Sequence, residues 1–131
     1  MAYTRKILLV DDERELIETV RPFLEARGYQ VVIAYNGREA LEKVKDSPDL
    51  ILLDIMMPGL DGLEVLRRLR NDDSTSKIPI IMLTAKSETK SLFDAQDLEA
   101  TDYIIKPFSL DDLYTQIGRY LDEDKRRPVK I

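Results

Sequence analysis

Leu50-Ile51-Leu52-Leu53-Asp54 is an unbroken run of four apolar residues that ends on a carboxylate. A turn-like segment, residues 55–59, separates it from Asp61-Gly62, where an amphipathic helical pattern opens. A continuous apolar run bounded by turn residues is typical of a strand that is buried on both faces of a sheet. Parallel sheets place their functional groups at the carboxyl ends of their strands. We therefore predict that Asp54 stands at the carboxyl edge of a central parallel strand, although an aspartate here also suits a simple turn cap.

Strand-like apolar segments alternate with amphipathic helical segments along the rest of the chain. We expect strands at Lys6–Val10, Tyr29–Ala34, Leu50–Asp54, Ile78–Leu83 and Asp102–Ile105, and helices near residues 13–27, 37–45, 62–70, 89–98 and 110–121. Ser109, with Asp112 three residues later, carries the capping signature of a helix start. This alternation predicts an α/β fold whose parallel sheet is covered by helices on both faces.

The composition excludes several classes of function. The chain has 131 residues, which suits one domain, and its net charge of −5 argues against direct nucleic-acid binding by this domain. It contains no cysteine and no histidine, which rules out disulfides, thiol nucleophiles, Ser-His-Asp triads and His-ligated metals. No apolar run approaches membrane-spanning length, and residues 1–6 lead into the first strand without a signal sequence. We expect a cytoplasmic domain that does not associate with membranes.

Polar residues stand at the ends of four expected strands. Asp11 and Asp12 follow the first, Asp54 ends the third, Thr84 follows the fourth and Lys106 follows the fifth. Because these ends lie along one edge of a parallel sheet, the side chains can converge. Two carboxylates about 4 Å apart repel by about 4 kcal/mol at an effective dielectric constant of about 20. A cluster of three therefore either raises a pKa or binds a cation, and oxygen ligands without His or Cys favour Mg²⁺.

The charges of this group suit phosphoryl transfer. Three carboxylates, one lysine and one Mg²⁺ sum to zero, and a neutral, metal-loaded pocket can accept a phosphoryl group on a carboxylate. The metal and the ammonium group would neutralise the transferring oxygens, and Thr84 would donate a hydrogen bond to one of them. Each residue taken singly also has an ordinary role, as a helix cap, a solvated lysine or a strand-end hydroxyl. Their placement on four different strands favours a functional site.

The segments around these strand ends carry a family resemblance. They are Leu9-Val10-Asp11-Asp12-Glu13, Leu53-Asp54-Ile55-Met56-Met57-Pro58-Gly59-Leu60-Asp61-Gly62, Met82-Leu83-Thr84-Ala85 and Tyr103-Ile104-Ile105-Lys106-Pro107-Phe108. Together they resemble the receiver domains of the response regulators of two-component signal transduction, the CheY-like family. The resemblance covers residues 5–122 and leaves residues 123–131 as a charged tail or the start of a linker. It implies a flavodoxin-like (βα)5 fold, a doubly wound parallel sheet with strand order 2-1-3-4-5.

The resemblance also implies a role for each residue of the site. Asp54 is expected to be the phosphoacceptor and a ligand of Mg²⁺, for which Mn²⁺ would substitute. Asp12 would bind the metal directly, Asp11 would act through water, and the backbone carbonyl of Met56 would complete the protein ligands. Thr84 and Lys106 are expected to contact the phosphoryl group, and the small side chain of Ala85 is expected to leave space for it. Tyr103 would be the aromatic switch residue, and the peptide bond before Pro107 is expected to be cis. Met56 and Lys86 occupy positions that tune the rate of dephosphorylation in the family.

The function expected from the resemblance is that of a phosphorylation-dependent signalling switch. It would accept phosphoryl from a sensor histidine kinase or a histidine phosphotransfer protein, catalysing only its own phosphorylation and dephosphorylation. The surface of the fourth helix, fifth strand and fifth helix would then change to control an unknown effector or a phosphorylation-dependent dimer. The alternative is a phosphorylation-independent pseudo-receiver, which would need a damaged pocket. An aspartate phosphatase would carry Asp-x-Asp after the first strand, and a nucleotide-binding domain a glycine-rich loop; neither motif is present here.

The sequence departs from the family pattern in two places. Glu99-Ala100 stands where the family usually has Gly-Ala before the fifth strand, so we expect a differently shaped end of the fourth helix. Gln116 and Gly118 occupy positions where winged-helix regulators often carry arginine. This second departure weakens the case for their mode of dimerisation and does not affect the phosphorylation site.

Overall fold

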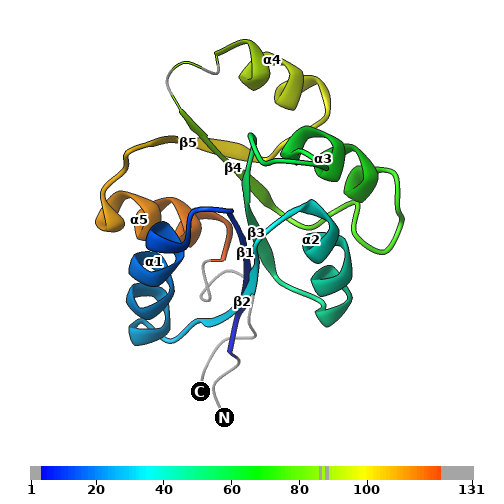
Figure 1. The fold of residues 1–131 in the computed structure, drawn as a ribbon. Helices are drawn as coiled ribbons and strands as arrows, with labels where there is room; N and C mark the ends of the chain where they lie inside the picture. The colour runs from blue at the N-terminus through cyan, green and yellow to red at the C-terminus, as the bar shows by residue number, and fades with distance from the viewer. Residues whose placement is uncertain (1–3, 86, 88, 122–131) are drawn as a thin grey trace.

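Five strands and five α-helices alternate in the described part of the chain, as the sequence predicts (Figure 1). The computed structural model describes residues 4–85, 87 and 89–121. The strands are β1 (Lys6–Val10), β2 (Gln30–Ala34), β3 (Leu50–Asp54), β4 (Ile80–Ala85) and β5 (Asp102–Lys106). The α-helices are α1 (Arg14–Ala26), α2 (Gly37–Lys43), α3 (Gly62–Arg70), α4 (Thr89–Asp97) and α5 (Leu110–Tyr120), and a short 3-10 helix, η1, spans Val44–Asp46.

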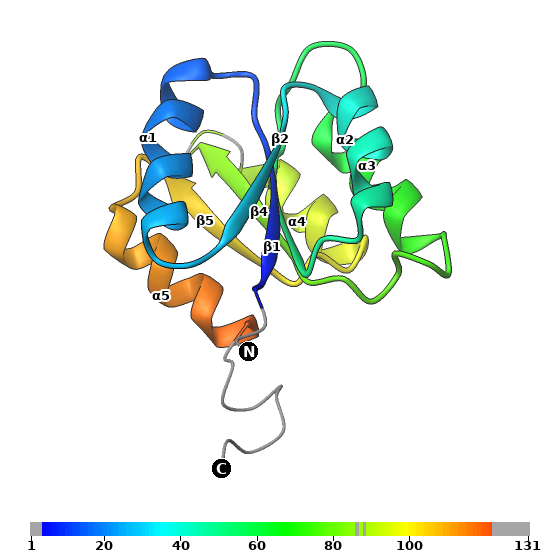
Figure 2. The ribbon, with the colours of Figure 1, turned by 90° about the horizontal axis from the view of Figure 1, so that it is seen from below.

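All five strands are parallel and stand in the order β2-β1-β3-β4-β5. Helices α1 and α5 cover one face of the sheet, and α2, α3 and α4 cover the other (Figure 1, Figure 2). This arrangement confirms the predicted flavodoxin-like, doubly wound fold with strand order 2-1-3-4-5. Because β3 lies in the middle of the sheet, its carboxyl end is flanked by the ends of β1 and β4.

The sheet divides the core into two layers. Ile7 and Leu9 of β1 pack with residues of α1 and α5, whereas Leu8 and Val10 pack with residues of α2 and α3. All five residues of β3 are buried, which explains why its first four residues are all apolar instead of alternating with polar ones. Burial of each large apolar side chain contributes about 1.5–3 kcal/mol. The last residue of β3 is therefore carried on a firmly held strand.

The structure corrects several predicted boundaries. β4 begins at Ile80 and not at Ile78, because the N–H of Ile78 donates to the carbonyl of Thr75 in the preceding turn. β4 and β5 each run further than predicted, so Thr84 and Lys106 lie inside their strands and not after them. α2 is shorter than predicted, since its last turn tightens into η1. These shifts leave the order of the elements unchanged.

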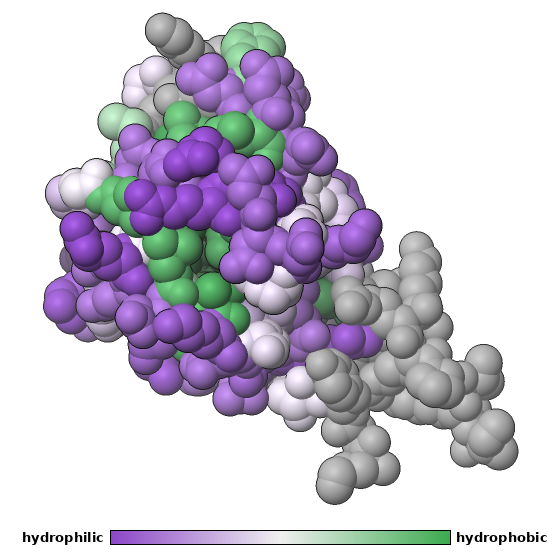
Figure 3. Space-filling model, turned by 90° about the vertical axis from the view of Figure 1, so that its right-hand side faces the viewer, coloured by the Kyte–Doolittle hydropathy of each residue, from purple (hydrophilic) through white to green (hydrophobic). Residues whose placement is uncertain are grey.

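The face of the molecule formed by α2 and α3 is mostly hydrophilic (Figure 3). On the side formed by α2 and α3, hydrophilic residues surround a small hydrophobic hollow (Figure 3). A groove there is lined by Leu41 and Leu60 and by charged residues of both helices, including Arg38 and Arg68. No helix within residues 4–85, 87 and 89–121 is long and apolar enough to cross a bilayer.

Candidate functional site

The parallel pairing of the strands brings the predicted polar residues to one edge of the sheet. Val10 of β1 pairs with Leu53 of β3, which places Asp11 beside Asp54. Asp54 pairs in turn with Leu83 of β4, the residue before Thr84. Ala85 of β4 pairs with Lys106 of β5. The carboxyl edge therefore collects side chains from β1, β3, β4 and β5, as the sequence predicts.

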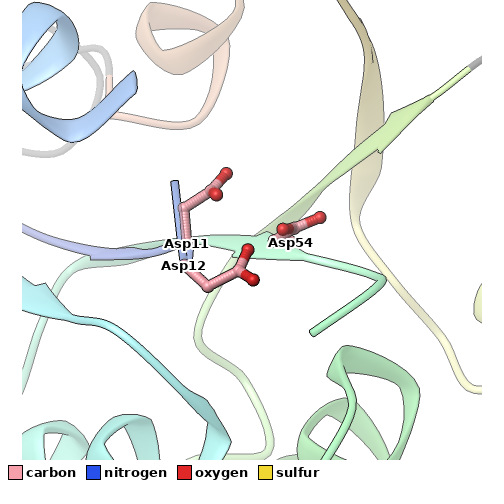
Figure 4. A group of neighbouring side chains, drawn as sticks. All are labelled: Asp11, Asp12 and Asp54. Atoms are coloured by element: carbon pink, nitrogen blue, oxygen red, sulfur yellow. The ribbon is translucent and has the colours of Figure 1, made fainter. Parts of the chain in front are cut away.

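Three carboxylates form the centre of this site (Figure 4). Asp11, Asp12 and Asp54 each offer an oxygen, and these oxygens all lie within 4.8 Å of one another. Asp11 and Asp54 are buried, whereas Asp12 is exposed. Oδ1 of Asp11 accepts a hydrogen bond from the backbone N–H of Glu13 at 2.9 Å, and its buried Oδ2 atom contacts Nζ of Lys106 at 2.8 Å. The mutual repulsion of the three carboxylates and their all-oxygen donor set fit a hard divalent cation such as Mg²⁺.

The surroundings of Asp54 favour its protonated form while no cation is bound. Burial of the carboxyl group and the charge of Asp11 raise the pKa of Asp54 from its ordinary 3.8 to about 7, with a smaller contribution from Asp12. The charge of Lys106 and a hydrogen bond from the backbone N–H of Met56, 3.3 Å from Oδ1, act in the opposite direction. Such a raised pKa on a buried carboxylate with specific charged partners is typical of a functional site.

Lys106 reaches the acidic cluster from β5. Its Nζ atom lies 2.8 Å from Oδ2 of Asp11 and 3.5 Å from Oδ2 of Asp54. It also donates a hydrogen bond to Oε1 of Glu13, at 2.9 Å. Burial lowers the pKa of Lys106, but Asp11, Glu13 and Asp54 outweigh burial and raise it above its ordinary value. Lys106 is therefore a permanent positive charge in the pocket.

Glu13 is the site residue that the sequence analysis did not identify. It occupies the N-cap position of α1, where Ser, Thr, Asp and Asn are favoured because their side chains cap the helix. Among the described residues the Glu13 side chain makes no capping hydrogen bond and instead accepts one from Lys106. An acid that is poorly suited to capping, directly after two other acids, is the signal that would have pointed to it.

Backbone packing fixes the loop after Asp54. The N–H of Gly62 donates to the carbonyl of Ile55 at 2.8 Å. A Cβ atom added to Gly62 would lie 2.0 Å from the carbonyl oxygen of Asp54, so only glycine fits there. Asp61 then caps α3 by accepting a hydrogen bond from the N–H of Glu64 at 2.9 Å. The start of α3 is thereby packed directly against the end of β3.

The remaining predicted residues fall into two groups. Thr84 is buried and Ala85 is partly buried beside the cluster, and the hydroxyl of Thr84 donates to the carbonyl of Ala85 at 3.2 Å. The peptide bond between Lys106 and Pro107 is cis. Met56 follows Asp54 by two residues, and its side chain is 59% exposed. Lys86 lies outside the described residues.

Tyr103 does not belong to the group that converges on Asp54. It pairs with Met82, whereas the pairing partner of Thr84 is Ile105. The side chain of Tyr103 is 42% exposed, and its backbone carbonyl accepts a hydrogen bond from Gln116 of α5 at 2.6 Å. The ring therefore lies at the surface of β5 in this state, outside the pocket.

The end of α4 differs from the expectation based on Glu99. The N–H groups of Glu99 and Ala100 donate to the carbonyls of Gln96 and Ala95, at 3.0 and 2.9 Å. Glu99 has a φ angle of 68°, in the left-handed region that glycine normally occupies. This is the hydrogen-bond pattern of a Schellman motif. Glu99 thus adopts the backbone conformation that glycine would provide, at the cost of about 1 kcal/mol of strain.

Comparison with known proteins gives a consistent result. The sequence model of the response regulator receiver domain matches residues 7–118. The chain is 40% identical over 128 residues to the transcriptional regulatory protein CrdR of Helicobacter pylori, an alignment that covers 97% of this chain and 58% of that protein. It is 41% identical over 132 residues to the phosphate regulon transcriptional regulatory protein PhoB of Pseudomonas aeruginosa, again covering 97% and 58%. The chain thus spans little more than half the length of these curated relatives.

A solved structure supports the same similarity. The chemotaxis protein CheY4 of Vibrio cholerae superimposes with a TM-score of 0.85 and 32% sequence identity, over 91% of this chain and 100% of that one.

Proposed function

Because the chain belongs to the response regulator receiver domains, which are signalling domains and not metabolic enzymes, we propose that it is a phosphorylation-dependent switch with Asp54 as the phosphoacceptor. One observation supports this proposal above the others. Asp54 shares a cluster of three carboxylates, whose oxygens lie within 4.8 Å of one another, and its Oδ2 atom faces the ammonium group of Lys106 at 3.5 Å. A nucleophile, a cation-binding set and a fixed positive charge are thereby assembled in one place.

In the proposed reaction a carboxylate oxygen of Asp54 attacks phosphorus. A P–O bond forms to Asp54 as the bond between phosphorus and the phosphohistidine nitrogen of the donor protein breaks, and the electron pair leaves with that nitrogen. We infer that Asp12 binds Mg²⁺ directly, that Asp11 acts through water, and that Asp54 and the backbone carbonyl of Met56 complete the set, with Mn²⁺ as a substitute. Bound Mg²⁺ would supply positive charge to the transferring oxygens.

Residues of β4 and β5 are proposed to receive the phosphoryl group. Lys106 would neutralise one oxygen, since its Nζ atom already faces the acceptor. Thr84 would donate its hydroxyl to another oxygen in exchange for its bond to the carbonyl of Ala85. The small side chain of Ala85 leaves this space open. Met56 is exposed beside the acceptor, and we propose that it tunes hydrolysis by limiting the access of water.

The output is proposed to arise on the surface of α4, β5 and α5. A small cavity of about 110 Å³, lined by Met82, Ala95 and Tyr103 among others, lies between α4 and β5. We infer that movement of Thr84 toward the phosphoryl group lets the exposed ring of Tyr103 move inward. That change would alter the face offered to a downstream effector or to a second copy of the chain. The donor is proposed to be a sensor histidine kinase or a histidine phosphotransfer protein.

The test uses a small phosphodonor and intact-mass measurement. Protein is incubated with acetyl phosphate in Mg²⁺ or in excess chelator, and Asp54→Asn is compared with Asp61→Asn. Asp61 is a suitable control because it is a nearby exposed aspartate whose capping role asparagine preserves. We expect one added phosphoryl group in wild type and Asp61→Asn, only with Mg²⁺, and none in Asp54→Asn. Modification of Asp54→Asn would refute the acceptor assignment, and a wild type that binds Mg²⁺ but stays unmodified would favour a pseudo-receiver.

A further inference from the structure

We propose that Glu13 is a displaceable counter-ion of Lys106. Its carboxylate would hold the ammonium group of Lys106 before phosphorylation and release that group to the phosphoryl oxygens afterwards. The inference rests on the proposed function, because it concerns how the same pocket admits an anion. Glu13 would be a positioning residue: it touches neither donor nor acceptor and acts through Lys106.

Three carboxylates compete for the ammonium group of Lys106. An ammonium group has three donor hydrogens, and three carboxylates surround this one. Nζ lies 2.8 Å from Asp11, 2.9 Å from Glu13 and 3.5 Å from Asp54. Asp11 and Glu13 therefore both hold Nζ at hydrogen-bond distance. The two shorter contacts thus hold the ammonium group back from the acceptor, which has the longest of the three.

Of the two closer partners of Lys106, only Glu13 is free to move away. Asp11 has a fully buried side chain and belongs to the cation-binding cluster, so it is fixed in place. The side chain of Glu13 is 59% exposed. It borders an open groove of about 590 Å³ that Leu16, Pro107 and Phe108 also line. Glu13 can therefore swing into solvent at little cost, whereas Asp11 cannot.

Glu13 also adds negative charge at the mouth of the pocket. A phosphodonor is an anion, and Glu13 is an additional carboxylate beyond the three that bind the cation. It opposes entry of the donor by direct repulsion and by occupying the lysine that the transferred oxygens need. Removal of its charge should therefore favour anions in the pocket and should not favour cations. The opposite effects on anion and cation affinity distinguish this role from a merely structural one, because a damaged pocket would bind both anions and cations more weakly.

The experiment compares Glu13→Gln with Glu15→Gln, which removes the same charge two residues further along α1. Glu15 also borders the groove but, within the described residues, makes no salt bridge with Lys106. Three quantities are measured for each protein: Mg²⁺ affinity by calorimetry, beryllofluoride affinity at saturating Mg²⁺, and the rate of phosphorylation by subsaturating acetyl phosphate. Thermal unfolding of both variants checks that they are folded.

We expect Glu13→Gln to bind beryllofluoride more tightly and to be phosphorylated faster, each by about two- to fivefold, the range for breaking an exposed ion pair. Its Mg²⁺ affinity should be unchanged or slightly lower, and Glu15→Gln should resemble wild type in all three measurements. Beryllofluoride affinity equal to wild type, weaker binding of both ions, or an equal gain in Glu15→Gln would overturn the role of Glu13. If wild type itself takes up neither beryllofluoride nor phosphoryl, the proposed function falls as well.

Discussion

Replacing Asp54 by asparagine should stabilise the metal-free protein. The Asp54 side chain is 6% exposed, and its pKa rises from 3.8 to about 7 on folding. At about 1.4 kcal/mol for each tenfold change in proton affinity, ionising Asp54 in the folded state costs up to about 4 kcal/mol. Asparagine has nearly the same shape and no charge. We expect Asp54→Asn to raise the free energy of unfolding by about 2–4 kcal/mol at pH 8 in chelator.

The free energy of unfolding of the wild-type protein should fall as pH rises, because of Asp54. Between pH 4 and pH 7 the folded protein keeps a proton on Asp54 that the unfolded chain releases. The stabilisation from Asp54 is therefore complete below about pH 4, and it is lost as pH rises toward 7, with a slope of up to about 1.4 kcal/mol per pH unit. Asp54→Asn lacks this slope, so the difference between the two proteins should widen from pH 5 to pH 8.

Urea unfolding followed by circular dichroism measures the effect, in chelator and in Mg²⁺. Mg²⁺ at a tenfold excess over its Kd should recover about 1.4 kcal/mol in wild type. It should recover less in Asp54→Asn, which lacks one of the three carboxylates. If Asp54→Asn is no more stable than wild type at pH 8 in chelator, or if the difference is the same at pH 5, then burial does not strain this carboxylate and the electrostatic argument is wrong.

Four further predictions concern the pocket, its output and the packing of two glycines. Gly62→Ala should lower the free energy of unfolding by about 1–3 kcal/mol in urea unfolding, because its Cβ would lie 2.0 Å from the carbonyl oxygen at the end of β3. Gly118→Ala should instead raise the free energy of unfolding by about 1 kcal/mol, because its Cβ would meet no other atom of the described residues. Asp12→Ala should weaken Mg²⁺ binding in calorimetry more than Asp11→Ala, and equal losses would mean that both acids bind the ion directly. Thr84→Ala should still accept phosphoryl but lose most of the beryllofluoride-induced gain in self-association or effector binding; an unchanged gain would contradict the proposed link from Thr84 to the α4-β5-α5 surface.

The sequence was sufficient to predict the architecture and the convergence of the acidic cluster. Strands and helices have different apolar periods, and parallel strands carry their carboxyl ends to one edge. The convergence of Asp11, Asp12 and Asp54 therefore follows from their positions at the ends of two apolar runs. The order of the strands in the sheet could not be predicted in this way, because the alternation of strands and helices does not specify it. The predicted order came from the family resemblance.

Features that depend on distant contacts could not be predicted in the same way. The local sequence marks Glu13 as an unusual helix cap, but it does not identify Lys106, 93 residues away, as its partner. Glu99 adopts a left-handed backbone because the hydrogen bonds at the end of α4 outweigh its local preference. The side chain of Tyr103 is exposed. Its predicted role as a switch concerns the phosphorylated conformation, which neither the apolar periodicity of the sequence nor the contacts of a single conformation describe.

The central claim is that Asp54 carries the phosphoryl group, and mapping the acyl phosphate tests it most directly. Borohydride reduces a phosphorylated aspartate to homoserine, which peptide mass spectrometry can locate. After treatment with acetyl phosphate and Mg²⁺, we predict homoserine at position 54, and aspartate retained at positions 11, 12 and 61. Homoserine at any of these other positions, with position 54 unmodified, would contradict the account.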